Sequence, residues 1–187
     1  MKVGIIGAGA VGAACAMALG QRGSAREIVL VDVARSPAKA VALDMRDGSP
    51  TPPTADIGEG SHDDLGGANL VLITAGVNDK AGGATDRSDG EGRLKLLDTN
   101  ASIYRAILPQ PVAVVPDAVP MVVTDPLEQV RNAVEHDVGF ANITIEGNNV
   151  SQYGIGIVCA RLTEAILRGK RSVFPAASYQ ATCGATR

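Results

Sequence analysis

The chain has 187 residues and a composition that is 45% hydrophobic, which is enough apolar material for a folded domain with a buried core. Its 17 Lys and Arg residues do not exceed its 20 Asp and Glu residues, and only 3% of its residues are aromatic, so nucleic acid is not an expected partner. No apolar run has the roughly 18 residues needed to cross a membrane, and a signal peptide is not expected, since the predicted first strand begins at Val3.

Short apolar runs alternate with helical patterns along the first two thirds of the chain. Apolar runs bounded by glycine or polar residues predict strands, and four are expected, at residues 3–6, 27–31, 69–74 and 121–124. Spacing of apolar residues typical of helices predicts helices at residues 11–21, 93–108, 127–145 and 151–168.

The remaining segments are assigned from local signals. Ser36 and Pro37 predict the N-cap and first residue of a helix that stops before Gly48. The glycine-rich stretch 78–92 is expected to be a long flexible loop of the kind that often forms a functional lid. Val173 and Phe174 begin a further expected strand.

Alternation of strands and helices predicts an α/β fold, a Rossmann-type parallel sheet with helices on both faces. We expect this domain to cover residues 1–126 and residues 127–187 to form a second, truncated unit. Ligands of such sheets bind at the carboxyl ends of the strands, so those ends are where a site is expected.

A glycine motif follows the first predicted strand. Gly7, Gly9 and Gly12 form the pattern Gly-x-Gly-x-x-Gly, in which the glycines allow a tight turn, close approach of a pyrophosphate and close packing of helix on strand. Asp32 ends the second strand 20 residues after Gly12, where a carboxylate accepts hydrogen bonds from ribose hydroxyls. Because a carboxylate would repel a 2′-phosphate, the pair predicts NAD rather than NADP as the cofactor.

Two other strand ends carry candidate residues. Ala75 and Gly76 form either a simple glycine turn or a gap that lets a cofactor cross the sheet. Asp125 either hydrogen-bonds a substrate hydroxyl or caps the following helix. Of the two histidines, His62 is expected to be a solvated loop residue and His136 an exposed helical residue rather than a catalytic acid.

Several segments resemble the lactate/malate dehydrogenase family of NAD-dependent 2-hydroxy acid dehydrogenases. The similar segments, which occur in the family's order, are residues 1–12, 73–78, 93–101, 123–126 and 153–167. The resemblance implies an NAD site formed by Gly7, Gly9, Val11, Gly12, Asp32, Gly76, Val77, Asn100 and Thr124.

The resemblance also implies substrate-binding and catalytic roles. Arg93 matches the arginine that polarises the substrate carbonyl, and Arg87 is a rival for that role. Ser151 stands where the family usually has a substrate-contacting threonine. Asp125 replaces the usual asparagine and is a second candidate for a catalytic role, although a carboxylate beside a carboxylate substrate costs binding unless an arginine neutralises it.

The sequence departs from the family after Leu127. The family section that carries the proton-transferring Asp–His pair and the carboxylate-binding Arg has no counterpart before Arg131. Pro111 and Pro120 stand where a helix and the start of a strand should run, and they suggest disruption there. The segment 127–187 is therefore expected to be a remnant of the substrate domain that leaves apolar surface exposed, which self-association would cover.

Two functions follow from these observations. The first is NAD-dependent hydride transfer to and from a small 2-hydroxy or 2-oxo acid, and the enzyme class rests on the resemblance. The alternative is an inactive dinucleotide-binding homologue or partner subunit. The expected assembly is a homo-oligomer, and three widely spaced cysteines in no metal-ligand pattern favour reduced thiols, no metal site and a cytoplasmic location.

Overall fold

The computed structural model describes residues 1–48, 55–77, 95–123 and 151–174. Its centre is a five-stranded sheet in the order β3-β2-β1-β4-β5, and every neighbouring pair of strands is parallel. The strands are β1 (Lys2–Ile6), β2 (Glu27–Val31), β3 (Asp56–Gly60), β4 (Leu70–Ile73) and β5 (Val119–Val122). This order confirms the predicted Rossmann-type sheet.

Both faces of the sheet are covered, which explains why the central strands are apolar at successive positions. In β2, Ile28 and Leu30 point into one core, and Val29 and Val31 point into the other. All four side chains are at most 7% exposed. Alternation of side chains along a strand therefore divides the apolar residues between two helical layers.

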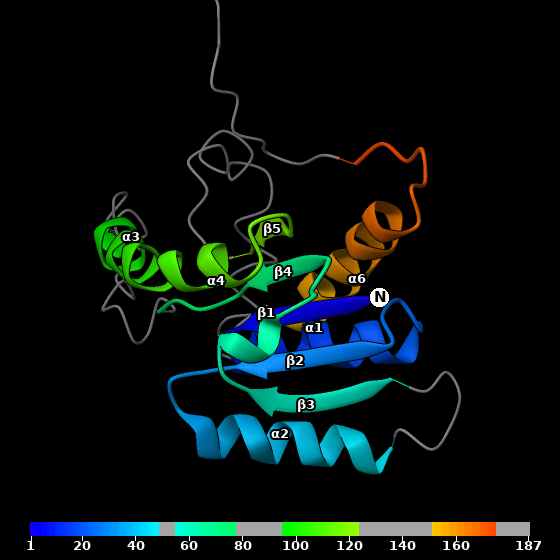
Figure 1. Ribbon diagram of the computed structural model, residues 1–187, viewed down its shortest axis with the longest axis horizontal. Helices are drawn as coiled ribbons and strands as arrows, with labels where there is room; N and C mark the ends of the chain where they lie inside the picture. The colour runs from blue at the N-terminus through cyan, green and yellow to red at the C-terminus, as the bar shows by residue number, and fades with distance from the viewer. Residues whose placement is uncertain (49–54, 78–94, 124–150, 175–187) are drawn as a thin grey trace, which may run out of the picture.

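The helices complete those layers (Figure 1). They are α1 (Ala10–Gln21), α2 (Arg35–Asp47), the 3-10 turn η1 (Asp63–Leu65), α3 (Lys95–Ile107), α4 (Pro109–Val114) and α6 (Tyr153–Leu167). Helices α1, α2 and α6 contribute to one core, whereas η1, α3 and α4 border the other. None of the helices in the described ranges is long and apolar enough to span a lipid bilayer.

The sequence prediction missed strand β3. Its sequence Asp-Ile-Gly-Glu-Gly contains only one large apolar residue, Ile57, because β3 lies at the edge of the sheet. It pairs with β2 in parallel, from Asp56 opposite Glu27 to Gly60 opposite Val31. The edge position relaxes the need for continuous apolar residues, so the apolar pattern alone did not reveal the strand.

The predicted start of α2 was wrong by two residues. The N-cap is Ala34 and the helix begins at Arg35, so Ser36 and Pro37 lie inside the first turn. Proline is tolerated there because the first backbone N–H groups of a helix have no partner within the helix. The predicted end before Gly48 is confirmed.

The two prolines interpreted as disruptive do not break their elements. Pro111 is buried in the first turn of α4, where a missing N–H costs no helical hydrogen bond. Val119, the first residue of β5, donates a backbone hydrogen bond to Asn69, just before β4, at 3.1 Å, and Val123, just after β5, donates one to Ile73 of β4 at 2.9 Å. Because these donors alternate along the strand, the nitrogen of Pro120 faces away from β4. Among the described residues β5 is the last strand on this side of the sheet, a position in which proline is accepted.

Helix α6 packs directly on α1. A Cβ atom on Gly156 would lie only 2.6 Å from the backbone oxygen of Ala14, so the two helices are in close backbone contact. The buried thiols of Cys15 and Cys159 are free and hydrogen-bonded to each other, and this contact with burial raises the pKa of Cys15. These two cysteines are therefore free thiols within the core, while Cys183 lies outside the described ranges.

A buried carboxylate fastens the other end of this helix pair. Glu164 of α6 is 7% exposed and accepts from Arg22 at the end of α1 at 2.6 Å. Its second oxygen accepts from Arg168 and Lys170 at 2.6 and 2.8 Å. These cations hold the pKa of Glu164 down at about 2. Although α6 comes from the segment predicted as a separate unit, it is thus attached to the Rossmann sheet.

Some predictions fall on residues that the structure does not describe, and one predicted strand is not found. The predicted loop 78–92, the helix 127–145 and most of the boundary region near residue 126 lie outside the described ranges. The predicted strand at Val173 is wrong for the residues described, since 171–174 have no regular structure and Val173 is 99% exposed. The division into 1–126 and 127–187 stays a prediction.

Candidate functional site: a dinucleotide site at the carboxyl ends of the strands

The turn between β1 and α1 has the geometry that its glycines predict. Gly7 has φ +104°, a conformation that L side chains rarely adopt. A Cβ atom on Gly12 would lie 1.8 Å from the backbone oxygen of Gly7, so no side chain fits between turn and helix. By contrast, a Cβ atom on Gly9 would meet nothing within 4 Å. The protein's own packing thus requires Gly7 and Gly12, whereas Gly9 borders open space.

Asp32 joins the end of β2 to this turn. Its Oδ2 accepts a hydrogen bond from the backbone N–H of Ala8 at 2.7 Å, and its Oδ1 accepts one from Ala34 at 2.9 Å. The carboxylate is half-buried, and its two oxygens together have about four lone-pair positions. Two backbone bonds leave acceptor positions for the hydroxyl groups of a ribose.

The end of β4 closes the turn from the opposite side. The Thr74 hydroxyl donates to the backbone oxygen of Gly7 at 2.7 Å. The space that a Cβ on Gly7 would need is filled by Ala75, whose backbone nitrogen would lie 2.6 Å away. Sequence reasoning did not name Thr74 as a site residue; its signal was a hydroxyl residue immediately after a buried strand, at the edge where ligands bind.

Asn100 connects helix α3 to the segment after β4. Its side chain is 4% exposed, and its Oδ1 accepts a hydrogen bond from the backbone N–H of Val77 at 2.9 Å. Gly76, between Ala75 and Val77, is exposed. Among the predicted cofactor residues, Val77 and Asn100 are thus in direct contact, and Gly76 is held at the surface beside them.

The glycine turn, Asp32 and the segment after β4 lie where the order of the strands in the sheet reverses. The chain passes from β1 outward to β2 and β3, and then crosses to β4 on the other side of β1. Figure 1 shows the carboxyl ends of β1 to β4 at the same edge, next to the start of α2 and α3. In open α/β sheets this crossover position, between β1 and β4, is where ligands bind.

The predicted substrate residues are mostly outside the part described. Arg87, Arg93, Thr124 and Asp125 all fall in the gaps between the described ranges. Ser151 is described and exposed, two residues before α6 begins. Because Gly156 of α6 lies against Ala14, near the start of α1, Ser151 is at the same end of the helix pair as the glycine turn.

His62 differs from its prediction. It precedes η1 and is half-buried, and its Nε2 is shielded from solvent with no hydrogen-bond partner among the described residues. The expectation of a solvated loop histidine is therefore wrong. His136 lies outside the described ranges.

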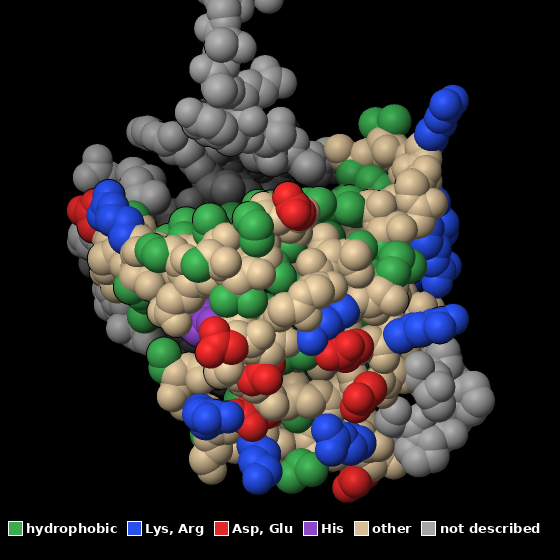
Figure 2. Space-filling model, in the orientation of Figure 1, with side chains coloured by type: hydrophobic (Ala, Val, Ile, Leu, Met, Phe, Trp, Pro, Cys, Tyr) green, Lys and Arg blue, Asp and Glu red, His purple; other side chains and the backbone are tan. Residues whose placement is uncertain are grey.

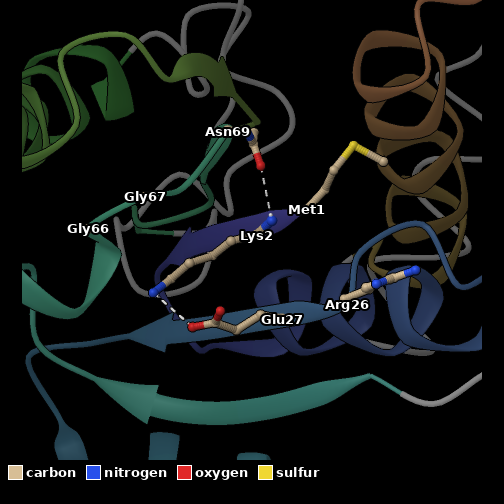
Figure 3. Close-up of a pocket in the computed structure, with 7 residues that line it drawn as sticks. All are labelled: Met1, Lys2, Arg26, Glu27, Gly66, Gly67 and Asn69. Carbon is tan, nitrogen blue, oxygen red and sulfur yellow. Dashed lines mark hydrogen bonds and ion pairs between the residues drawn. The ribbon is translucent and has the colours of Figure 1, made fainter.

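A separate hollow opens at the amino ends of the strands (Figure 3). Three of its residues pair with one another: the Lys2 ammonium contacts Glu27 at 2.8 Å, and the Lys2 backbone N–H donates to Asn69 at 3.1 Å. Residues of the glycine turn do not line it. This hollow is therefore not the predicted cofactor site.

The residues at the carboxyl edge fit a dinucleotide. The open space at Gly9 and the first backbone N–H groups of α1 provide what a pyrophosphate needs, and no acidic side chain occupies the first turn of α1. Asp32 provides acceptors for a ribose without a 2′-phosphate. These hydrogen-bond donors and acceptors thus suit NAD.

Comparisons with known proteins agree with this geometry. Residues 1–145 match the family model of the lactate/malate dehydrogenase NAD-binding domain. The chain is 40% identical to an L-lactate dehydrogenase of Chloroherpeton thalassium over 151 residues, which are 81% of this chain and 47% of that protein. It is 40% identical to an L-lactate dehydrogenase of Thermus aquaticus over 128 residues, which are 68% of this chain and 39% of that protein. The chain thus spans about half the length of the curated relatives it matches or less.

A solved structure shows the same fold. A minor L-lactate dehydrogenase of Enterococcus mundtii superposes with a TM-score of 0.78 at 24% identity, covering 96% of this chain and 82% of that one. With the glycine turn, Asp32 and the family match together, the chain belongs to the lactate/malate dehydrogenase family and carries its NAD-binding domain.

Proposed function

We propose that this chain binds NAD at the carboxyl ends of β1, β2 and β4 for hydride transfer to and from a small 2-hydroxy or 2-oxo acid. One observation carries the proposal: Asp32 and Gly7–Gly12 are held together by a direct hydrogen bond, beside open space at Gly9. The relatives named L-lactate dehydrogenase support this reaction class.

The described residues supply the binding part of this function. Backbone N–H groups at the start of α1 face the pyrophosphate position, where the partial positive charge of a helix terminus favours an anion. Asp32 accepts from the adenosine ribose. Thr74 and Asn100 fix the segments on either side, so the site is formed before the cofactor arrives.

The reaction needs further groups, which we assign from the sequence. The bound cofactor supplies or accepts the hydride. Arg93 stabilises the negative charge that develops on the substrate carbonyl oxygen, with Arg87 as the rival for that role. The hydroxyl of Ser151 and the side chain of Asp125 contact the substrate. All four assignments stay predictions.

A second function is favoured by one sequence feature. Hydride transfer to a ketone also needs a proton for the forming alkoxide, usually from a histidine whose pKa is near neutrality. The family section that carries this histidine has no counterpart between Leu127 and Arg131. A chain that holds NAD without turnover, as an inactive homologue or partner subunit, is the alternative. The cytoplasmic location and the homo-oligomer stay predictions.

Oxidation of NADH by the purified protein, followed by absorbance with pyruvate and then oxaloacetate, distinguishes the two functions. Turnover with either acid, lost in Asp32→Ala, supports the dehydrogenase, and His136→Ala then tests the remaining histidine as proton donor. Saturable NADH binding without turnover supports the binding function. Failure to bind NADH contradicts both.

A further inference from the structure

An ion pair lies beside the adenosine end of the candidate site. Arg35, the first residue of α2, donates from Nε to Oε1 of Glu59 at 2.6 Å. Glu59 is the fourth residue of β3 and lies opposite Leu30, two residues before Asp32. The Arg35 side chain is 67% exposed and that of Glu59 only 14%. The carboxylate is thus the more buried member of the pair and the guanidinium the more exposed one.

A further carboxylate acts on the same arginine. Asp64 is held by the backbone N–H and the hydroxyl of Ser61 at 2.7 and 2.8 Å, bonds that lower its pKa. The charge of Asp64 adds to that of Glu59, and both raise the pKa of Arg35, with the Glu59 hydrogen bond the larger cause. Figure 2 shows acidic and basic side chains mixed over the region of β2, β3 and α2. The carboxylates of Glu59 and Asp64 therefore attract the Arg35 guanidinium towards β3.

The neighbourhood of Asp32 and Arg35 gives two opposite signals. A carboxylate at the end of β2 favours a ribose with free hydroxyls, whereas an arginine close by is the group that accommodates a 2′-phosphate. Arginine binds phosphate through a planar fork of donors, and a guanidinium already bonded to a carboxylate has lost part of that fork. Whether the Arg35 guanidinium can bind a phosphate on the ribose therefore depends on the carboxylate with which it is paired.

We propose that Glu59 is a cofactor-specificity residue that acts by position: it holds Arg35 on β3 and so withholds from a 2′-phosphorylated dinucleotide the cation it would need. Asp32 disfavours the 2′-phosphate directly, and Glu59 disfavours it by occupying its counter-ion. This inference rests on the proposed dinucleotide site. It adds a residue from the edge strand β3 to the discrimination between NADH and NADPH.

The expected effect of Glu59 is modest while Asp32 is present. Exposed ion pairs are weak, so releasing Arg35 should strengthen NADPH binding only about two- to fivefold. Where Asp32 no longer repels the phosphate, the released arginine should have a larger effect. NADH lacks the 2′-phosphate and should bind unchanged when Glu59 is altered.

The test is a titration of NADH and NADPH, each followed by the nucleotide's own fluorescence, against a set of full-chain variants. The single variants are Glu59→Gln, Arg35→Gln and Asp32→Ser. A double variant combines Asp32→Ser with Glu59→Gln, and a triple variant adds Arg35→Gln to that pair. Asp63→Asn is the matched control, because it removes one negative charge from the exposed η1 turn beside Asp64. Thermal unfolding of each variant shows that it is folded.

The proposal expects Glu59→Gln to strengthen NADPH binding with NADH affinity unchanged, more strongly in the Asp32→Ser background, and Arg35→Gln to abolish the gain. Two results would overturn it: a gain from Glu59→Gln no larger than that from Asp63→Asn, or a gain that survives Arg35→Gln. If the unmodified chain binds NADH and either of these two contradicting results appears, only the specificity inference fails. If it binds neither nucleotide, the proposed function fails, and the inference with it.

Discussion

The carboxylate of Asp32 accepts a hydrogen bond from the backbone N–H of Ala8 at 2.7 Å, across 24 residues of sequence. This bond joins the end of β2 to the glycine turn, so the group that would contact the ribose also positions the loop that would contact the pyrophosphate. A bond from a backbone N–H to a charged oxygen is stronger than one between neutral groups. The two parts of the proposed dinucleotide site are therefore joined by a hydrogen bond of the chain itself.

Gly9 and Gly12 should respond in opposite ways to the same added methyl group. Gly9→Ala should change the free energy of unfolding by less than about 0.5 kcal/mol, since its Cβ meets no protein atom and its φ is −71°. It should weaken NADH binding about tenfold or more, because the methyl fills the space of the pyrophosphate. Gly12→Ala should cost about 3 kcal/mol of stability through overlap with the Gly7 oxygen.

Urea unfolding and NADH titration of both alanine variants test this contrast. Each variant is the other's control, since the substitution is the same and the sites are three residues apart. Equal loss of stability in both would show that the space at Gly9 is not open, and unchanged NADH affinity in Gly9→Ala would remove the pyrophosphate from this turn.

Asn100 should be a stability residue as well as a member of the site. Asn100→Ala leaves the backbone N–H of Val77 without the acceptor 2.9 Å away, which should cost about 1–3 kcal/mol. Asn100→Asp keeps an acceptor oxygen at that position and should retain more of the stability. Urea unfolding of both variants measures the difference; an aspartate variant less stable than the alanine variant would contradict this role for Oδ1.

Glu164 should make the α1–α6 contact sensitive to acid. Its pKa in the folded chain, about 2, is below the ordinary value of 4.5 because three cations contact it. A depressed pKa means that its contribution to stability is fully present above pH 4.5 and is lost as the pH falls towards 2. Glu164→Gln should therefore lower the melting temperature at pH 7, and the gap from the unmodified chain should narrow in acid.

Thermal unfolding followed by circular dichroism from pH 7 down to pH 2.5 tests this dependence. Glu27→Gln is a suitable control, since Glu27 pairs with Lys2 at the surface, where ion pairs contribute little. A Glu164→Gln deficit that stays constant throughout the acid range would show that the charge of Glu164 is not the cause.

If the chain turns over substrate, Arg93 should matter more for the rate than for cofactor binding. Arg93→Ala should reduce kcat about 100-fold or more, the usual effect of removing a group that stabilises charge on the reacting oxygen. NADH affinity should stay the same. Steady-state kinetics with a parallel NADH titration checks both, and an unchanged rate would transfer the role to Arg87, to be tested by Arg87→Ala.

Much of the fold was predictable because the central strands carry a strong local signal. Residues of β1, β2 and β4 are apolar at nearly every position, as burial on two faces requires, and the glycine motif follows the first of them at the expected place. The edge strand β3 was not predictable in this way. Edge strands bury fewer side chains; Asp56 and Gly58 are typical of turns when considered alone, and Glu59 is a residue type depleted in strands.

The residues proposed for the site come from the sequence, whereas the bonds that connect them come from the fold. Gly7, Gly12 and Asp32 were identified from spacing, because their roles depend on backbone geometry that a short motif encodes. That Asp32 bonds to Ala8, that Thr74 fastens the turn and that Glu59 holds Arg35 depend on which strands are neighbours. Strand order is a long-range property that no local pattern carries.

The measurement that tests the account most directly is the titration of NADH with the unmodified chain, Asp32→Ala and Asp44→Ala. Asp44 lies exposed on α2, so Asp44→Ala removes the same charge away from the site. We predict saturable NADH binding by the unmodified chain and by Asp44→Ala, and binding weakened about tenfold or more in Asp32→Ala, through lost ribose contacts and a released glycine turn. Equal affinity of all three chains, or no NADH binding by the unmodified chain, would contradict the dinucleotide site.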